Sequence, residues 1–368
     1  MRSETRSVSS FESVPEQHEA KRLLAAALAE GPVHAYLFHG PAGVGKRELA
    51  LRFAGELLGD QARVSRRSHP DLYVLEPLGE QIRIDDVREL RRDLHMRPFE
   101  ADRRVYLVFG ADSLNEDAAD ALLKDLEEPP LYAVIVLVAE RLGPLPETIR
   151  SRCQLVPFRR LSEPALREAI AKHAAGLSEA EIATLARTAG GRLGRALQLL
   201  DPASTRRRTE LIRVARGVYT EPGFDTSAAT DALLAGIEER GTEAKAAAEV
   251  HVETLELTGR EAEQRIRRAQ RGAEREELLA LLEELEWWYR DLVVVAAGAE
   301  GAAVHVDHLA DLREDATHER LIGAEHACEL VRAAWREAEE LQVTTSLALE
   351  ALLIRLRGEL APSAATSA

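Results

Sequence analysis

The sequence is poor in cysteine, in aromatic residues and in long apolar runs. Its 368 residues include two cysteines, Cys153 and Cys328, too few for a disulfide framework or a four-thiolate metal site. Aromatic residues make up 4% of the chain, while Ala, Leu, Glu and Arg dominate, which favours helix over sheet. No run approaches the ~20 apolar residues that span a membrane, and the polar N-terminus does not resemble a signal peptide. We therefore expect a cytoplasmic, reduced protein that does not bind membranes.

The charge of the chain is acidic overall. A formal net charge of −15 argues against a free-standing nucleic-acid binder, which usually carries a basic excess. Arginine clusters do occur, and the simplest interpretation is that they lie on solvated helices balanced by neighbouring glutamates. The clusters are Arg63, Arg66 and Arg67; Arg206, Arg207 and Arg208; and Arg265, Arg267, Arg268 and Arg271.

Short apolar runs alternate with helical patterns in the first 160 residues. The runs predict buried strands at residues 35–39, 72–76, 104–109 and 133–139, with helices between them. Strands that are apolar throughout and alternate with helices are typical of a parallel sheet covered on both faces. We therefore predict an α/β P-loop core with a parallel sheet, followed by an all-α remainder.

The remainder has helical periodicity and no convincing strand. A serine followed by an acid predicts helix starts at Ser162 and Ser178, and residues 201–204 resemble a linker. Long amphipathic helices are expected beyond residue 205, with breaks near residues 222–223, 241 and 298–301. The predicted division is a disordered N-terminus 1–10, a nucleotide-binding core 11–158, a helical lid 159–204, a helical C-terminal domain 205–358 and a disordered tail 359–368.

A phosphate-binding loop follows the first predicted strand and opens a helix. Its glycines allow backbone N–H groups to surround phosphate oxygens, and the helix N-terminus adds positive potential there. Lys46 is placed to reach the terminal phosphates, so the GxxxxGK spacing in this context is a strong signal. The predicted nucleotide-binding residues of the loop are Gly40, Pro41, Ala42, Gly43, Val44, Gly45, Lys46 and Arg47.

The residues that would hold a metal ion beside this loop are missing. The eighth loop position should be a Ser or Thr that ligates Mg²⁺, but Arg47 occupies it, and a guanidinium has no acceptor. The third strand should end in two acids, and it ends in Phe109 and Gly110; Asp112 lies too far along to replace them. We expect that Mg²⁺ is not held here, that the chain hydrolyses little or no nucleotide, and that ATP or ADP binding remains open.

Several motifs together resemble the delta-prime subunits of the bacterial replicative clamp loader, a part of DNA polymerase III. The resemblance runs from about residue 11 to residue 356 and is strongest between residues 34 and 158. The matching segments are HAYLF at 34–38, HPD at 69–71, IDDVREL at 84–90, LLKDLEEPP at 122–130, IRSRC at 149–153, GRAL at 194–197, WYRDL at 288–292 and the final helix at 347–356.

The resemblance implies an AAA+ core, a lid and a collar that joins subunits into a ring with a gap. The partners it implies are the gamma/tau and delta subunits in a pentamer, with the sliding clamp and primer-template DNA reached through that complex. Delta-prime is then a stator of the DNA polymerase holoenzyme, and its Ser-Arg-Cys arginine, here Arg152, is a catalytic arginine finger for a neighbour's ATP. Without the motif, Arg152 would be interpreted as one partner of an ordinary ion pair at the surface. Arg195, with Arg192 as a second candidate, matches the lid arginine that senses nucleotide phosphates.

The chain departs from the family at one segment. Gly59–Ser68 is short and has no cysteine, so the zinc module usual in these subunits is not expected, and His69 is interpreted as a structural, hydrogen-bonding histidine. The adjacent aromatics Trp287, Trp288 and Tyr289 favour packing in the collar over a base-stacking platform, because neighbouring helical positions point in different directions.

Two other functions are compatible with a phosphate loop. The first is an active gamma/tau-type AAA+ ATPase, against which Arg47, Phe109 and Gly110 argue. The second is an AAA+ helicase loader that binds DNA directly, against which the LLKDLEEPP and collar motifs argue. ATP turnover by the chain alone separates the first of these from the stator.

Overall fold

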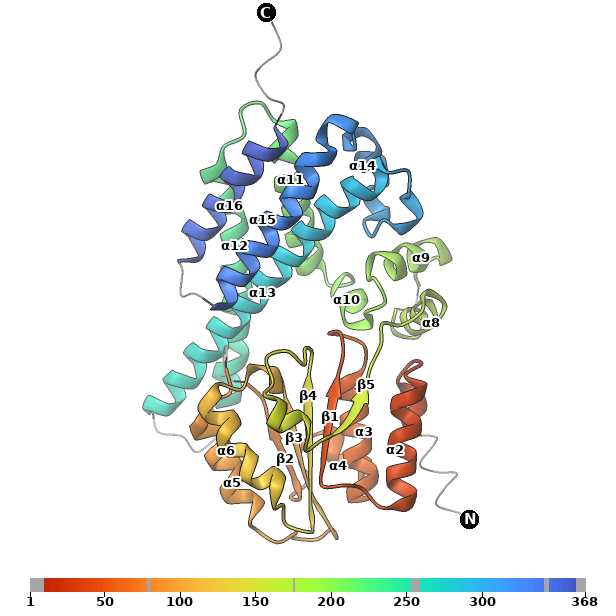
Figure 1. Cartoon of the computed structure of the whole chain (residues 1–368), viewed down its shortest axis with the longest axis vertical. Helices are drawn as coiled ribbons and strands as arrows, with labels where there is room; N and C mark the ends of the chain where they lie inside the picture. Colours follow the sequence, from red (N-terminus) through yellow and green to blue (C-terminus); the bar gives the residue numbers. More distant parts are fainter. Residues whose placement is uncertain (1–9, 78–80, 175, 253–258, 341–343, 362–368) are drawn as a thin grey trace, which may run out of the picture. The chain divides into compact units, whose positions relative to one another are not determined.

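An α/β region and an all-helical region make up the described chain, residues 10–77, 81–174, 176–252, 259–340 and 344–361 of this computed structural model (Figure 1). The chain divides into two compact units, residues 1–177 with 191–195, and residues 178–190 with 196–368. Because this division cuts through the predicted lid, the three-domain boundaries remain a prediction. No helix among the described residues is both long and apolar enough to cross a membrane.

Five parallel strands form the sheet, in the order β2-β3-β4-β1-β5. The parallel α/β core predicted from the apolar runs is therefore confirmed. Sequence reasoning missed β5, because only Leu155 and Val156 are apolar between a glutamine and a proline. The strands are β1 Ala35–His39, β2 Leu72–Leu75, β3 Arg104–Phe109, β4 Ala133–Ala139 and β5 Gln154–Pro157.

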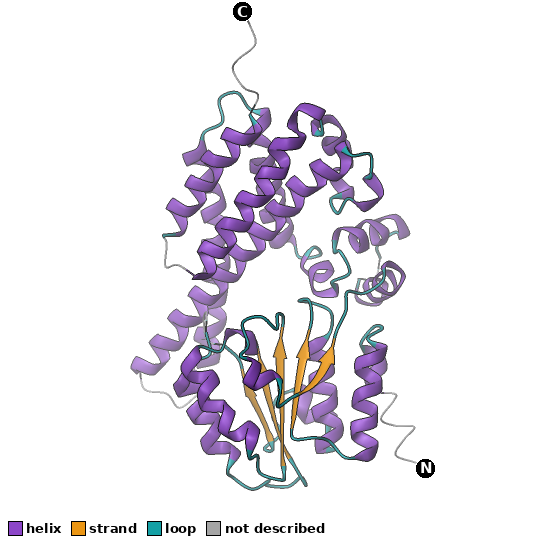
Figure 2. Ribbon diagram, viewed as in Figure 1, coloured by secondary structure: helices purple, strands orange, loops and turns teal. Residues whose placement is uncertain are grey.

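Helices cover both faces of the sheet, as Figure 2 shows. Successive side chains of a strand point to opposite faces, so Tyr36 and Phe38 join one apolar cluster while Ala35 and Leu37 join another. The first cluster includes α2 and α3, and the second includes α5 and α6. The helices of this region are α2 His18–Glu30, α3 Lys46–Leu58, α4 Gln61–Ser65, α5 Ile84–Leu94, α6 Glu116–Glu127 and α7 Glu147–Arg150.

The carboxyl ends of the strands meet at one edge of the sheet. Because all strands are parallel, the loops after β1, β2, β3 and β4 leave from this edge. Ligands of open α/β sheets bind at this edge. The phosphate loop follows β1, so the fold places it beside the residues that follow β2, β3 and β4.

Three short helices follow the sheet: α8 Glu163–His173, α9 Glu179–Thr188 and α10 Leu193–Gln198. The two predicted helix starts are confirmed, since Ser162 Oγ accepts from Ala165 N and Ser178 Oγ from Glu181 N. The predicted linker at 201–204 is wrong. There, Asp201 accepts from Ser204 N at 2.8 Å and begins helix α11, Pro202–Thr220.

Long helices fill the C-terminal region, and two of the three predicted breaks occur, at 222–223 and 298–301. The break predicted at Gly241 is wrong, because α12 runs through it. A Cβ on Gly241 would lie 2.4 Å from Glu274 Oε1 on α13, so this glycine permits a close approach between two helices. The helices are α12 Thr226–Val252, α13 Gly259–Ala296, α14 Leu309–Asp315, α15 Leu321–Glu340 and α16 Thr345–Leu360.

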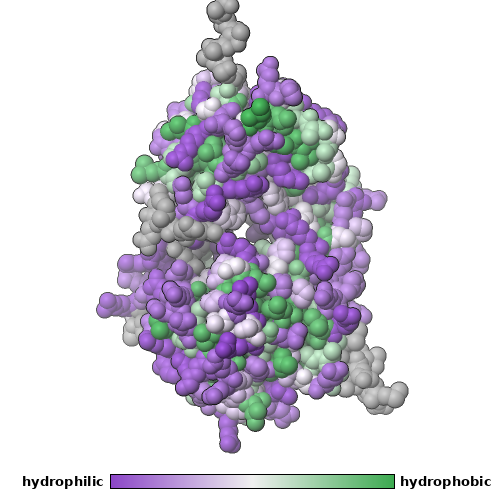
Figure 3. Space-filling view, in the orientation of Figure 1, coloured by the Kyte–Doolittle hydropathy of each residue, from purple (hydrophilic) through white to green (hydrophobic). Residues whose placement is uncertain are grey.

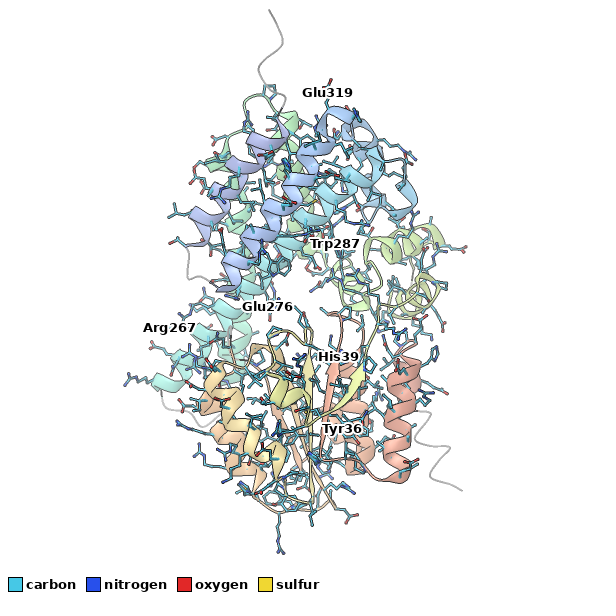
Figure 4. All side chains as sticks on the ribbon, in the orientation of Figure 1. Tyr36, His39, Arg267, Glu276, Trp287 and Glu319 are labelled. Carbon is cyan, nitrogen blue, oxygen red and sulfur yellow. The ribbon has the colours of Figure 1, made fainter. Side chains whose placement is uncertain are left out.

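Trp288 and Tyr289 of α13 are fully buried in the core of the helical unit. Trp288 Nε1–H donates to the Tyr219 hydroxyl at 3.1 Å, and that hydroxyl lies 3.1 Å from Asp315 Oδ2. Trp287, labelled in Figure 4, is only partly buried. Two of the three adjacent aromatics are therefore core residues, as the packing interpretation predicts.

Candidate nucleotide-binding site

Three glycines of the phosphate loop have backbone conformations that other residues rarely adopt. The φ angles are 140° at Gly40, 69° at Gly43 and 101° at Gly45. A Cβ on Gly40 would lie 2.2 Å from the Phe158 carbonyl oxygen, and one on Gly45 would lie 2.7 Å from Val14. The loop therefore needs glycine at these positions for both its conformation and its close packing.

Residues distant in sequence hold the loop. Gln17, which is almost fully buried, donates from Nε2 to the carbonyl oxygens of Val44 and Arg159 and accepts from Arg159 N at 3.1 Å. Gly194 N donates to the Gly43 carbonyl oxygen at 3.0 Å. The segment with Arg192 and Arg195 thus lies against the loop, whereas Gln17 gave no signal in the sequence, since a polar residue carries no sign of its burial.

Lys46 lies at the centre of the loop with 6% of its surface exposed. Its Nζ donates to the carbonyl oxygens of Gly40 and Pro41, at 2.5 Å each. Burial lowers the pKa of Lys46 to about 8, against the opposing influence of the nearby Glu140 and Asp112 carboxylates. The residue predicted to reach the phosphates is therefore held inside the loop by the backbone oxygens of the loop itself.

Arg47 and Phe109 contact each other where an active ATPase would hold Mg²⁺. The guanidinium carbon of Arg47 lies 4.2 Å from the centre of the Phe109 ring, a cation–π contact. Arg47 also pairs with Glu76, which follows β2, and Arg67 pairs with the same carboxylate at 3.0 Å. The two replacements seen in the sequence thus contact each other, and the guanidinium of Arg47 lies between the Phe109 ring and the Glu76 carboxylate.

The residues present fit a phosphate group but not a metal ion. Gly110 has a φ of 66° and an added Cβ would lie 3.2 Å from Pro77, so a catalytic acid there would be strained. Asp112 Oδ2 accepts from the backbone N of Glu140 and Arg141, at 3.2 Å each. Among the described residues, no group of three or more His, Cys, Asp or Glu is arranged to hold a metal.

Sequence reasoning missed Glu76 as part of this site. The signal was present in principle, because Glu76 follows β2, Phe109 ends β3, and these strands are neighbours in the sheet. Strand order, however, is decided by tertiary packing, and the sequence alone did not show that β2 pairs with β3. The shared contact of Glu76 and Phe109 with Arg47 is therefore visible only in the folded structure.

Arg152 lies away from the phosphate loop of its own chain. It precedes β5, in which Gln154 pairs with Tyr36, whereas the loop begins at Gly40, about 13 Å further along the strand direction. Its guanidinium donates to the Thr148 carbonyl oxygen at 2.7 Å and to Glu127 Oε1 at 2.5 Å, with about a third of the side chain exposed. The structure does not bring Arg152 together with the other predicted site residues.

Cys153, next to Arg152, is a poor nucleophile. Burial raises the pKa of its thiol to about 12, so the thiolate is scarce at neutral pH. This environment agrees with a small apolar packing role.

His69 is hydrogen-bonded within the fold. Its Nδ1 accepts from Asp71 N at 3.1 Å, and its Nε2 lies 3.2 Å from Glu100 Oε1. Asp71 in turn accepts from the backbone N of Phe99, Glu100 and Ala101. The HPD motif therefore ties the start of β2 to the segment before β3, and the short helix α4 occupies the position between α3 and this motif.

The sheet order and the phosphate loop define the class of protein. A phosphate loop after β1, which lies between β4 and β5 in a parallel sheet ordered β2-β3-β4-β1-β5 and followed by an all-α region, is the arrangement of AAA+ P-loop proteins. Residues 16–162 match the family described as "DNA polymerase III, delta subunit". Residues 16–162 are thus similar to the delta-prime type of clamp-loader subunit of DNA polymerase III.

Curated relatives show the same similarity. The delta-prime subunit of Bacillus subtilis is 33% identical over 147 residues, 37% of this chain and 45% of that protein. The delta-prime subunit of Pseudomonas aeruginosa is 38% identical over 135 residues, 33% of this chain and 41% of that protein. The tau subunit of Bacillus subtilis is 30% identical over 207 residues, 52% of this chain and 37% of that protein. The chain thus spans less than half the length of these relatives.

Among solved structures, a gamma subunit-related protein of Thermotoga maritima has a TM-score of 0.47 at 18% identity, covering 93% of this chain and 99% of that protein. At that score the likeness adds nothing about function.

Proposed function

We propose that this chain is a delta-prime, or stator, subunit of the clamp loader that helps load the sliding clamp onto primed DNA without hydrolysing ATP efficiently itself. The observation that carries the proposal is the packed unit of Arg47, Phe109 and Glu76 at the metal position. Phosphoryl transfer depends on a metal ion that bridges the phosphates. A fixed guanidinium there supplies charge but coordinates neither nucleotide nor water as Mg²⁺ does.

The phosphate loop supports a structural role for nucleotide. The backbone N–H groups of the loop and Lys46 would hold the phosphates of ATP or ADP, with Arg47 and Arg195 as further cations. A bound nucleotide would supply negative charge at this helix N-terminus and so stabilise the loop against Gly194 and Gln17. Neither Mg²⁺ nor zinc belongs to the proposed site.

The position of Arg152 supports a role toward a neighbouring subunit. An arginine finger supplied in trans stabilises the charge on the transferring phosphoryl group without a local metal. Arg152 lies away from the chain's own loop, and it is anchored by Thr148 and Glu127 while a third of its side chain stays exposed. Those anchors hold the guanidinium in place before a partner arrives.

An active gamma/tau-type ATPase is the second candidate, because the tau relative covers more of this chain than the delta-prime relatives do. Such an ATPase needs a hydroxyl at position 47 and acids at the end of β3. The contact between Arg47 and Phe109 opposes it.

The partners in this proposal are gamma/tau and delta subunits in a cytoplasmic pentamer, and the sliding clamp and primer-template DNA through that assembly. The test is an add-back assay of ATP turnover. The chain alone is expected to show no turnover above background, and gamma/tau plus delta should turn over ATP faster when the chain is added. An unchanged rate on addition would refute the stator role, and robust turnover by the chain alone would favour the second candidate.

A further inference from the structure

Helices α12 and α13 form a hairpin that continues beyond the apolar core of the helical unit. The α12 residues of that core end at Ile237, and the α13 residues begin at Leu281. About four turns of α12 and about six turns of α13 therefore extend past the core. Side chains in this extension are mostly exposed or half-buried. The face of the molecule in view in Figure 3 mixes hydrophilic side chains with several hydrophobic areas. Packing in the core of the helical unit therefore does not explain which residues occupy the surface of this extension.

One face of α13 in this extension carries a row of arginines. At 100° per residue, four arginines and Gln264 fall within an arc of about 100°. The row runs from Arg260 to Arg271, 11 steps along the helix and so about 17 Å. We call it the arginine stripe, and its members are Arg260, Arg267, Arg268 and Arg271. Figure 4 labels Arg267 on this part of α13.

Among the residues that the structure describes, the stripe is weakly neutralised. Arg267 lies 3.4 Å from Glu263, and both side chains are about two-thirds exposed, so this ion pair contributes little. Within the described ranges, Arg260, Arg268 and Arg271 have no carboxylate at ion-pair distance. The described residues therefore show an ion pair to a neighbouring glutamate for one of the four arginines of the stripe.

The chemistry of the stripe selects a ligand. A straight row of guanidinium groups matches a row of identical anions, and Arg is the residue best suited to phosphates. The stripe positions hold no aromatic or aliphatic anchor, which a protein partner or a single-stranded nucleic acid would need. The net charge of −15 disfavours binding by the chain as a whole, but exposed charges more than about 8 Å from the stripe are screened at physiological salt, so the local charge of the stripe carries the contact.

We propose that the arginine stripe of α13 binds the phosphate backbone of duplex DNA without reading its sequence. The inference does not depend on the stator function, since it concerns binding by the free chain without nucleotide or partner subunits. Four phosphate contacts predict a slope of log K against log salt of about −3.6, and an affinity in the range of non-specific binders, about 10⁻⁴–10⁻⁶ M at physiological salt.

The test is fluorescence anisotropy of a labelled duplex titrated with the full-length protein across a salt series. A triple variant, Arg260→Gln, Arg267→Gln and Arg271→Gln, should reduce the slope to about −0.9 and weaken binding at least 10-fold at low salt. The matched control removes the same charge from arginines elsewhere: Arg88→Gln, Arg213→Gln and Arg313→Gln. Circular dichroism verifies that both variants keep their helix content.

Four results would overturn the proposal. The first is an unchanged slope in the stripe variant, and the second is an equal loss in the control variant, which would be a net-charge effect. The third is tighter binding of a single strand than of the duplex. The fourth is displacement of the duplex by polyglutamate at equal charge concentration, which would identify an acidic protein as the ligand. A loss confined to the stripe variant, with the duplex preferred, supports it.

Discussion

Arg152→Ala is expected to slow ATP hydrolysis at the neighbouring subunit's site by about 10³-fold while the assembly still forms. The substitution removes the guanidinium that would stabilise the charge developing on the transferring phosphoryl group. Assembly should persist, because the hydrogen bonds of this side chain among the described residues go to Thr148 and Glu127 of its own chain. Single-turnover hydrolysis by the reconstituted complex measures the rate, and gel filtration measures assembly.

Two matched variants make this result specific. Arg152→Lys keeps the positive charge but loses the planar guanidinium with its several N–H donors, so it should recover little of the rate. Arg66→Ala removes an exposed arginine from the same unit and should leave the rate unchanged. If Arg152→Ala turned over ATP at the wild-type rate in a correctly assembled complex, the arginine-finger assignment would be wrong.

Trp288→Ala is expected to lower the free energy of unfolding of the helical unit by about 3–5 kcal/mol. The change empties a fully buried site and leaves the Tyr219 hydroxyl without the indole N–H that donates to it. Trp288→Phe keeps most of the volume but loses the donor, and we expect a loss of about 1–2 kcal/mol. Urea denaturation followed by circular dichroism provides the measurement.

The neighbouring tryptophan provides the control for this prediction. Trp287→Ala makes the same chemical change at a half-buried position, so its effect on unfolding should be clearly smaller. A base-stacking role for Trp288 predicts the reverse: unchanged stability together with weaker binding of single-stranded DNA. That outcome would contradict its assignment to the core.

Local signals in the sequence were sufficient for much of the α/β fold. Apolar runs located β1, β3 and β4 with their observed ends, and the glycines with Lys46 located the phosphate loop, because these features depend on neighbouring residues. The serine caps of α8 and α9 were equally local. Short strands with little apolar content, such as β5, lacked such a signal.

Features that depend on tertiary contacts were not predictable. Gly241 resembles a helix break in isolation, but the folded chain uses it to bring α12 against α13. The contacts of Arg47 with Phe109 and Glu76 require the strand order, and the burial of Gln17 requires the packing of the N-terminal segment on the loop. Sequence reasoning identified the missing metal ligands but not what replaces them.

The most direct test of the central claim is Mg²⁺-dependent ATP turnover by the purified chain alone. Lys46→Ala defines the background, because it removes the loop cation that any hydrolysing site would need. If the Arg47–Phe109–Glu76 unit excludes the metal, wild type and Lys46→Ala should turn over ATP at the same rate, with or without Mg²⁺. A wild-type rate at least 10-fold above that background, and dependent on Mg²⁺, would contradict the account.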